Sequence, residues 1–254
     1  MDLAEITDTL VRDTGRLRFG PPVRYVYNPL DYARGPYELY IQRFGQSKRD
    51  VLLVGMNPGP WGMAQTGVPF GDVSSVRDWL GIQAAVGTPT EEHPKRKVLG
   101  FACPRGEVSG LRLWGWVRQT FVTPKRFFKQ FFVANYCPLV FLEQTGRNRT
   151  PDKLPTRERQ HLLAACDRAL RHTVDYFQPR YVIGVGAFAA SRIRAALARY
   201  DVTLGRILHP SPASPRANRG WASIASAQLA ELGIRLPAAR RCSGPPAHTQ
   251  NDDC

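Results

Sequence analysis

Three polar side chains suited to catalysis or recognition lie at the ends of short apolar runs. They are Asn57 after VLLVGM, Asn135 at the end of FFVAN and His209 at the end of LGRILH. An Asn amide offers donors and an acceptor, so it can match a ligand edge that alternates the two. A His can donate to an oxygen that gains charge in a transition state. No carboxylate occurs at these run ends, so the set suits a reaction with a good leaving group.

Each of the three residues also has a purely structural interpretation. Asn57 precedes Pro58 and could form a turn. Asn135 could bond to local backbone at a strand end, and His209 could be a buried histidine with satisfied ring nitrogens. Their occurrence at the ends of three separate runs favours a shared site.

The loop around Asn57, GMNPGPWGMAQTGVPFG over residues 55–71, contains five Gly, three Pro and no charged residue. Such a loop makes a turn or lies against a flat, neutral ligand. Phe70 near its end could be a core residue, which is the commoner fate of a Phe, or a stacking platform. The residues alone leave both alternatives open.

The elements that position these residues follow from hydrophobic periodicity. Short apolar runs predict buried strands over residues 51–55, 131–137, 180–186 and 204–209. Helical spacing predicts helices over 156–177, with Thr156 as N-cap, and over 187–200 and 221–234.

Alternating strands and helices predict an α/β fold, with a central parallel β-sheet flanked by helices on both faces. Ligands of such sheets bind just beyond the carboxyl ends of the strands, where Asn57, Asn135 and His209 fall. The third strand delivers only Gly184 and Gly186 there.

The chain of 254 residues is long enough for a sizeable core. We predict a single domain over residues 21–236, preceded by a helix or loose arm over 1–20 and followed by a disordered tail over 237–254. No apolar run approaches the roughly 20 residues that span a bilayer. The polar start of the chain is unlike a signal peptide.

Thirty-five Lys and Arg against 21 Asp and Glu give a formal charge of +14. This excess favours a polyanionic partner, with nucleic acid ahead of a membrane surface. The five cysteines are scattered, with no CxxC pair, so we expect no disulfide framework, no metal site and a reducing intracellular compartment.

Five blocks of the sequence resemble the single-strand-selective monofunctional uracil-DNA glycosylases. The similarity covers about residues 20–236, and the wider uracil-DNA glycosylase superfamily matches more loosely in the first and last blocks. The blocks are GMNPGPWGMAQTGVPFGDVSSVRDWLGI (55–82), EEHPKRKVLG (91–100), EVSGLRLWGW (107–116), FFVANYCPLVFL (131–142) and LHPSPASPRANRGW (208–221).

This resemblance implies hydrolysis of the N-glycosidic bond of uracil and of 5-oxidised uracils such as 5-hydroxymethyluracil, in single- and double-stranded DNA. It implies no cofactor, no metal and no strand cleavage. Asn57 would position the attacking water and His209 would stabilise the departing uracil anion. Phe70 would stack on the base and Asn135 would read its Watson–Crick edge. The remaining pocket residues would be Met56, Gly59 and Met63.

The loop after His209 would contact DNA through Ser211, Ala213, Arg216, Asn218 and Arg219. A base in duplex DNA must be flipped out before a pocket can hold it, and this loop is placed to fill the gap in the stack. Family members similar to this chain carry an Arg directly after HPSP, where this chain has Ala213. Arg216 or Arg219 could substitute for it.

Two alternative functions would also act on DNA. One is a mismatch-type thymine or xanthine glycosylase, and the other is a non-catalytic protein that binds damaged DNA. An RNA-binding α/β module is a third, but it should show clustered exposed aromatics. We expect a monomer that works with DNA, in the nucleus of a eukaryote or in the cytoplasm and nucleoid of a bacterium.

Overall fold

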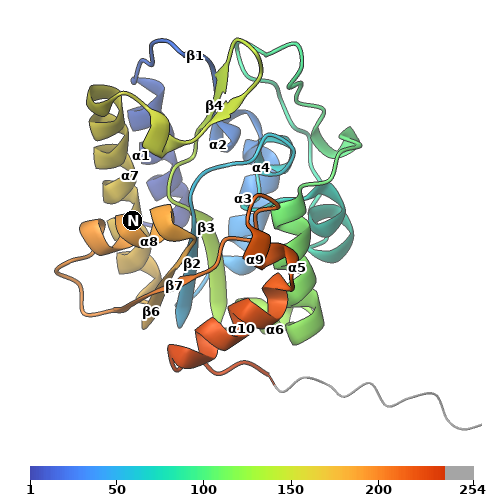
Figure 1. Cartoon of the computed structure of the whole chain (residues 1–254), viewed down its shortest axis with the longest axis vertical. Helices are drawn as coiled ribbons and strands as arrows, with labels where there is room; N and C mark the ends of the chain where they lie inside the picture. Colours follow the sequence, from blue (N-terminus) through green and yellow to red (C-terminus); the bar gives the residue numbers. More distant parts are fainter. Residues whose placement is uncertain (238–254) are drawn as a thin grey trace, which may run out of the picture.

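Four parallel strands form the central sheet of the computed structural model, which describes residues 1–237 (Figure 1). The order is β3-β2-β6-β7, and each strand overlaps its predicted run. The strands are β2 (Val51–Gly55), β3 (Phe131–Asn135), β6 (Tyr181–Val185) and β7 (Thr203–Ile207). Gly55 pairs with Asn135, and Val185 with Ile207, so the carboxyl ends of the strands lie level with one another.

Helices cover both faces of this sheet, which confirms the predicted α/β class (Figure 1). One face carries α1 (Leu3–Gly15), α7 (Thr156–Phe177) and α8 (Ala187–Ala196). The other face carries α5 (Val108–Phe121), α6 (Pro124–Phe128) and α10 (Trp221–Glu231).

Helix α3 (Arg34–Phe44) lies against the β3 edge of the sheet, where Tyr40 Oη donates to the carbonyl of Val133 at 2.9 Å. This contact satisfies an edge carbonyl and keeps the edge from pairing with another chain. Shorter segments complete the fold: α2 (Pro29–Tyr32), α4 (Met63–Thr66), α9 (Pro215–Asn218), a π-helical turn (Ser75–Trp79) and 3₁₀ turns (Gly100–Ala102, Pro151–Lys153).

The longest helix has the predicted bounds, but its predicted N-cap is wrong. Thr156 is already the first residue of α7, and the extended Pro155 flanks it without any side-chain cap. Pro155 has no side-chain oxygen that could cap the helix. Because Pro155 takes the N-cap position, the helix begins one residue earlier than it would with Thr156 as the cap. Gln178 ends the helix in the left-handed conformation.

The structure has a second, antiparallel sheet that the sequence did not predict. It has the order β1-β4-β5 and lies beyond the carboxyl ends of the parallel strands, at the top of Figure 1. Its strands are β1 (Val23–Tyr27), β4 (Val140–Glu143) and β5 (Asn148–Arg149). The predicted strand 131–137 ends at Asn135, because the chain turns before Pro138 into β4.

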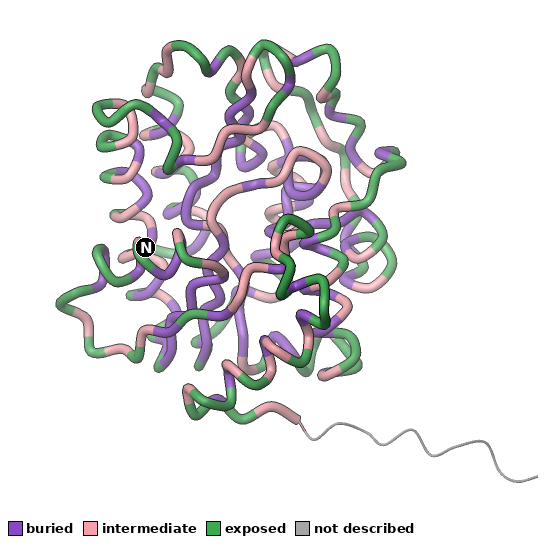
Figure 2. The backbone as a smooth tube through the Cα atoms, viewed as in Figure 1, coloured by how far each residue is buried: buried purple, intermediate pink, exposed green. Residues whose placement is uncertain are grey.

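The buried part of the chain runs through the four parallel strands (Figure 2). All five residues of β2 and of β6 are buried, as expected for strands covered on both faces. None of the helices within residues 1–237 combines the length and apolar character needed to cross a membrane. The predicted tail lies outside the described residues apart from Pro237.

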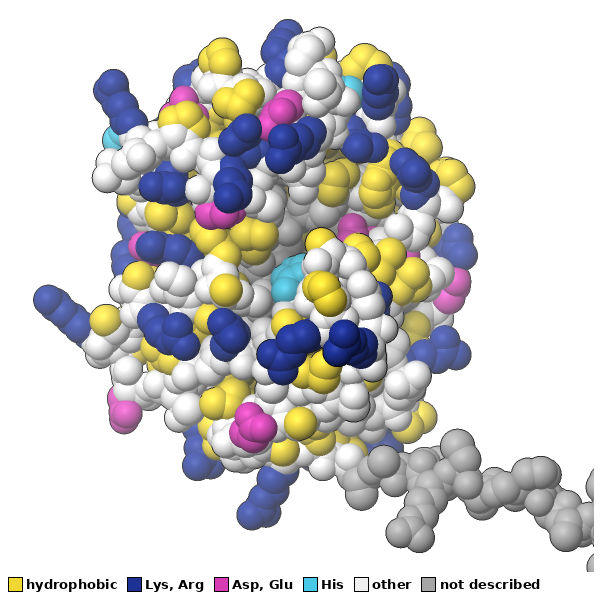
Figure 3. Space-filling view, in the orientation of Figure 1, with side chains coloured by type: hydrophobic (Ala, Val, Ile, Leu, Met, Phe, Trp, Pro, Cys, Tyr) yellow, Lys and Arg dark blue, Asp and Glu magenta, His cyan; other side chains and the backbone are white. Residues whose placement is uncertain are grey.

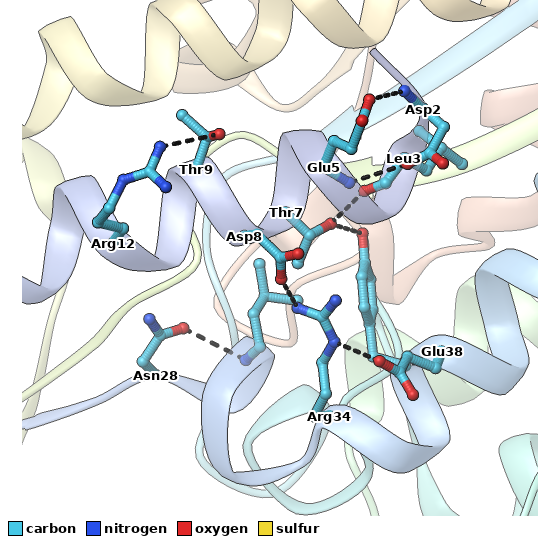
Figure 4. Close-up of polar contacts among 12 residues, drawn as sticks. Asp2, Leu3, Glu5, Thr7, Asp8, Thr9, Arg12, Asn28, Arg34 and Glu38 are labelled. Atoms are coloured by element: carbon cyan, nitrogen blue, oxygen red, sulfur yellow. Dashed lines mark hydrogen bonds and ion pairs between the residues drawn. The ribbon is translucent and has the colours of Figure 1, made fainter.

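The sequence left open whether residues 1–20 form a helix or a loose arm. The structure has a helix there, α1. Leu3, Ile6 and Leu10 on α1 are buried in apolar clusters of the fold. Asp8 forms an ion pair with Arg34 at 2.7 Å, and Figure 4 shows this contact between α1 and α3. Helix α1 therefore packs as part of the same body as the sheet.

Replacing Ile6 by Ala should lower the free energy of unfolding by about 2–5 kcal/mol, because the change leaves a cavity under α1. Arg12→Ala is the matched control, since Arg12 is exposed and bonds only to Thr9 on its own helix. Urea denaturation of both variants measures the difference. Equal stability of the two variants would mean that α1 is a loose arm in solution.

Candidate active site

A pocket of about 280 Å³ opens at the carboxyl edge of the parallel sheet. Figure 3 shows Lys and Arg side chains on both sides of a central hollow that exposes a His side chain. The pocket brings together eight of the predicted site residues: Met56, Asn57, Gly59, Met63, Phe70, Asn135, His209 and Ser211. These residues come from the first loop, from the end of β3 and from the loop after β7.

Gly55 at the end of β2 makes room for two of these side chains. A Cβ built there would clash with Asn135 Oδ1 and would lie 2.7 Å from the Phe70 ring. The Asn135 amide and the Phe70 ring therefore both close over a strand position that has no side chain of its own.

Phe70 sits in a left-handed backbone conformation with φ of +54°, which is uncommon for a residue with a Cβ. Its carbonyl accepts from Trp114 Nε1 at 3.1 Å and from the Asp72 amide at 2.8 Å. A Cβ at Gly110 would clash with the same carbonyl. The fold thus holds Phe70 where its ring is half-buried, 6.1 Å from the His209 ring between centroids.

The two Asn side chains are held by different partners. Asn57 Nδ2 donates to the Leu139 carbonyl at 3.0 Å, and this bond fixes the orientation of the Asn57 side-chain amide just beyond β2. Asn135 Nδ2 lies 3.2 Å from Met63 Sδ. A thioether is a weak acceptor, so a carbonyl oxygen that enters the pocket can replace it.

His209 follows β7 and packs against the glycine that follows the neighbouring strand β6. A Cβ at Gly186 would lie 3.1 Å from His209 Cβ, and Gly186 has a φ of +95° that favours glycine. Leu208 is anchored by α10, because its amide donates to Gln228 Oε1 at 2.7 Å and its carbonyl accepts from Trp221 Nε1 at 2.6 Å. The end of β6 thus provides space for His209 rather than a reactive side chain.

Burial lowers the pKa of His209 from 6.5 to about 4. Its imidazole is therefore neutral at physiological pH and keeps one N–H that can donate to an oxygen in the pocket.

The loop after His209 is braced from α5. Arg112 donates to the carbonyls of Pro210 and Ser211 at 3.1 and 3.3 Å, and to Asn218 Oδ1 at 2.8 Å. Asn218 Nδ2 in turn donates to the Pro212 carbonyl at 3.0 Å. The structure thus places Asn218 inside the loop as a brace, and its contact with DNA stays a prediction.

The other predicted DNA contacts lie outside the pocket. Ala213, Arg216 and Arg219 are exposed on this loop and on the short helix α9 that follows. The Ala213 amide donates to Ser211 Oγ at 3.1 Å, which places the Ala213 methyl group at an exposed turn. The two arginines put positive charge on the same side of the pocket.

The pocket also contains a carboxylate, which lies at none of the strand ends. Glu107 caps α5, accepts from the Ser109 amide at 3.3 Å and lines the pocket. Burial raises the pKa of this carboxyl. Glu107 lies 50 residues beyond Asn57 in the sequence, so its place in the pocket follows only from the fold.

Sequence analysis also missed polar residues of the antiparallel sheet and an aromatic residue of the first loop. Asn148 and Thr150, from β5 and the residue after it, line the pocket. The guanidinium groups of Arg96 and Arg105 both lie over the Trp61 ring, at 5.1 and 4.6 Å from its centroid. Within residues 1–237, no three His, Cys, Asp or Glu side chains lie close enough to hold a metal ion.

The sequence of this chain is similar to those of known proteins. The sequence profile of the Uracil DNA glycosylase superfamily matches residues 42–230. The single-strand selective monofunctional uracil-DNA glycosylase of Rattus norvegicus is 51% identical over 224 residues, which cover 87% of this chain and 81% of the rat protein. The Bos taurus protein of the same name is 51% identical over 221 residues, which cover 86% and 81%.

A solved structure shares the fold at low sequence identity. Wild-type SMUG2 of Pedobacter heparinus superposes with a TM-score of 0.62 at 15% identity, over 90% of this chain and 97% of that chain. Given the profile match and the identity of about one residue in two over most of the sequence, the chain belongs to the uracil DNA glycosylase superfamily.

Proposed function

We propose that this uracil-DNA glycosylase excises uracil and 5-oxidised uracils from both single- and double-stranded DNA, by hydrolysis and without cutting the strand. The observation that carries the proposal is the convergence of Asn135, Phe70 and His209 around the space above Gly55. We further propose that the protein acts as a monomer in the compartment that contains the DNA. This is the nucleus of a eukaryote, or the cytoplasm and nucleoid of a bacterium.

A flipped base would fit this space in one orientation. Its face would stack on the Phe70 ring, which is half-buried in the pocket. The Asn135 amide would accept from N3–H and donate to O4, replacing the weak contact with Met63 Sδ. The neutral His209 would donate to O2.

In the hydrolysis, Asn57 would orient the water that attacks C1′ of the sugar. The bond between C1′ and N1 breaks, the electron pair leaves with the base, and the charge spreads onto O2, where His209 donates. The water oxygen becomes the sugar hydroxyl, and one proton ends on the released base. Among the described residues that line the pocket none is a lysine, the residue that would form a Schiff base and lead to strand cleavage.

A substrate panel tests the proposal. The protein is incubated with oligonucleotides that carry uracil, 5-hydroxymethyluracil, thymine, hypoxanthine or xanthine, in single strands and duplexes. Gels are run with and without alkali. We expect cleavage of the uracil and 5-hydroxymethyluracil strands only after alkali. Preferred release of thymine or xanthine would instead support a mismatch-type glycosylase, and no release would support a protein that only binds damage.

We predict that His209 titrates near pH 4, because burial disfavours its charged form. The unfolded chain takes up a proton near pH 6.5 that the folded chain excludes. The contribution of His209 to stability is therefore complete above pH 6.5 and is lost as the pH falls towards 4. NMR titration of its ring protons measures the pKa, with His209→Gln assigning the signal. A midpoint above pH 6 would contradict a buried, neutral imidazole.

Asn57→Ala should slow single-turnover uracil excision roughly a hundredfold or more, because the attacking water loses its orienting group. Asn57→Asp should keep measurable activity, since a carboxylate can also bind the water and accept its proton. Asn28→Ala, which makes the same change at the cap of α2, is the control. Normal excision by Asn57→Ala would mean that Asn57 only forms the turn before Pro58.

Ala213→Arg should raise uracil excision from duplex DNA more than from single strands. A long side chain at this exposed turn can fill the vacated stack, and filling it offsets part of the flipping cost, which is a few kcal/mol in a duplex. Ala195→Arg, at an exposed position of α8, controls for the added charge. An equal gain on both substrates would contradict the idea that a side chain at position 213 fills the vacated stack.

A further inference from the structure

Trp61 holds two arginine side chains beside the pocket. The guanidinium carbons of Arg96 and Arg105 lie 5.1 and 4.6 Å from the centroid of its ring, within the range of a cation–π contact. Trp61 directly follows Pro60, which lines the pocket. Two positive charges are therefore fixed next to the mouth of the pocket, on the side of the first loop.

The side chains of this cluster come from three segments that the fold ties together. The fully buried Gln65 donates to the carbonyls of Pro60 and Lys97, at 2.9 and 3.0 Å. On the other side, the bare backbone of Gly62 packs against Glu107, because a Cβ on Gly62 would lie 2.8 Å from Glu107 Cγ. The segments that carry the two arginines are thus both fastened to the loop that carries the tryptophan.

The protein leaves the charge of both guanidinium groups without a counterion. Within residues 1–237, no carboxylate forms an ion pair with Arg96 or Arg105. Glu92, four residues before Arg96, pairs with Lys97 at 3.1 Å instead. Arg96 Nε donates to the Gly146 carbonyl at 2.9 Å, which fixes one edge of its guanidinium group. Arginine pairs of this kind suit the oxygens of a phosphate group.

A second basic group belongs to the loop that enters the pocket from β7. Arg216 and Arg219 are exposed there, and Figure 3 shows Lys and Arg side chains on both sides of the hollow. A nucleotide within a strand has a phosphate on each side of its sugar. A strand that places one base in the pocket therefore presents phosphates both to these arginines and to the Trp61 cluster.

We propose that Trp61, Arg96 and Arg105 form a DNA contact that binds a phosphate group next to the excised nucleotide. The two guanidinium groups donate to the phosphate oxygens, and Trp61 is a positioning residue that holds both groups. This inference rests on the proposed function, because it assumes that a DNA strand crosses this pocket. The contact involves the damaged strand alone, so it serves single strands and duplexes equally, unlike a side chain that fills the vacated stack.

The test measures binding of the full chain to a single-stranded oligonucleotide by fluorescence anisotropy over a series of salt concentrations. The oligonucleotide carries 2′-fluoro-2′-deoxyuridine, whose fluorine disfavours the positive charge that develops on the sugar and so prevents cleavage. Arg105→Gln removes one exposed charge. Trp61→Leu removes the ring, and Trp61→Phe keeps an aromatic ring at the same position.

Arg180→Gln is the matched control. Arg180 is also exposed and lies 5.2 Å from the ring centroid of Tyr181. It precedes the first residue of β6, so it is at the opposite edge of the sheet from the pocket. The control thus removes the same charge and the same kind of aromatic contact where a strand bound at the pocket is out of reach.

For Arg105→Gln we expect the dissociation constant to rise about threefold at low salt, as for one exposed ion pair. The slope of log K against log salt concentration should become shallower by about 0.7, the value for one phosphate of a single strand. Trp61→Leu should weaken binding by a similar factor, because both guanidinium groups lose their support, and Trp61→Phe should restore most of it. Arg180→Gln should change neither quantity.

Uncharged methylphosphonate linkages identify the phosphate that is bound. Each phosphate near the uracil analogue is replaced in turn, and the losses in affinity are compared between the wild type and Arg105→Gln. At the bound linkage the replacement should weaken the wild type clearly more than the variant, because both changes remove the same interaction. At the other linkages the two losses should add.

An unchanged salt slope in folded Arg105→Gln would overturn the inference, because the arginine would then only support the loop. An equal change in Arg180→Gln, or additive losses at every linkage, would overturn it as well, since either result means general attraction by charge. Failure of the proposed function is seen separately, as a wild type that shows the coupling but releases no uracil from an unmodified strand.

Discussion

The pocket depends on two places at the sheet edge where a Cβ is missing. Gly55 ends β2 beside Asn135, and its bare backbone lets the Asn135 amide and the Phe70 ring approach each other. Gly186 follows β6 and lets the imidazole of His209 pack against the backbone. Because the parallel strands end level, these two gaps lie side by side, and a planar base of few polar atoms suits the space above them.

The rest of the fold keeps those side chains from moving away. Trp114 on α5 holds the carbonyl of Phe70 in a conformation that costs of order 1–3 kcal/mol elsewhere. Trp221 on α10 holds the backbone just before His209. Arg112 braces the following loop. The large aromatic and basic side chains of the two helices thus position a site whose own residues are mostly small and neutral.

Much of this arrangement could be predicted from the sequence, because the parallel strands are continuous apolar runs and their carboxyl ends are where ligands bind. Asn57, Asn135 and His209 were found in that way. The antiparallel sheet could not be found, since β1 and β4 are more than 100 residues apart and β5 has two residues.

Glu107 was missed for a similar reason. It caps α5, a helix that the sequence analysis did not predict. Its second role as a wall of the pocket depends on α5 packing against the first loop, and no local pattern encodes such a contact. Gly186 was assigned no part in the site, because only the register of β6 and β7 shows that His209 needs its space.

The most direct test of the account is the single-turnover rate of uracil excision by Gly55→Ala. The added methyl group would meet Asn135 Oδ1 and the Phe70 ring, so the account predicts a loss of roughly a hundredfold or more, with DNA affinity nearly unchanged. Gly115→Ala on α5, where a Cβ meets nothing within 4 Å, is the matched control. Wild-type excision by folded Gly55→Ala would contradict the claim that the base is held over this gap.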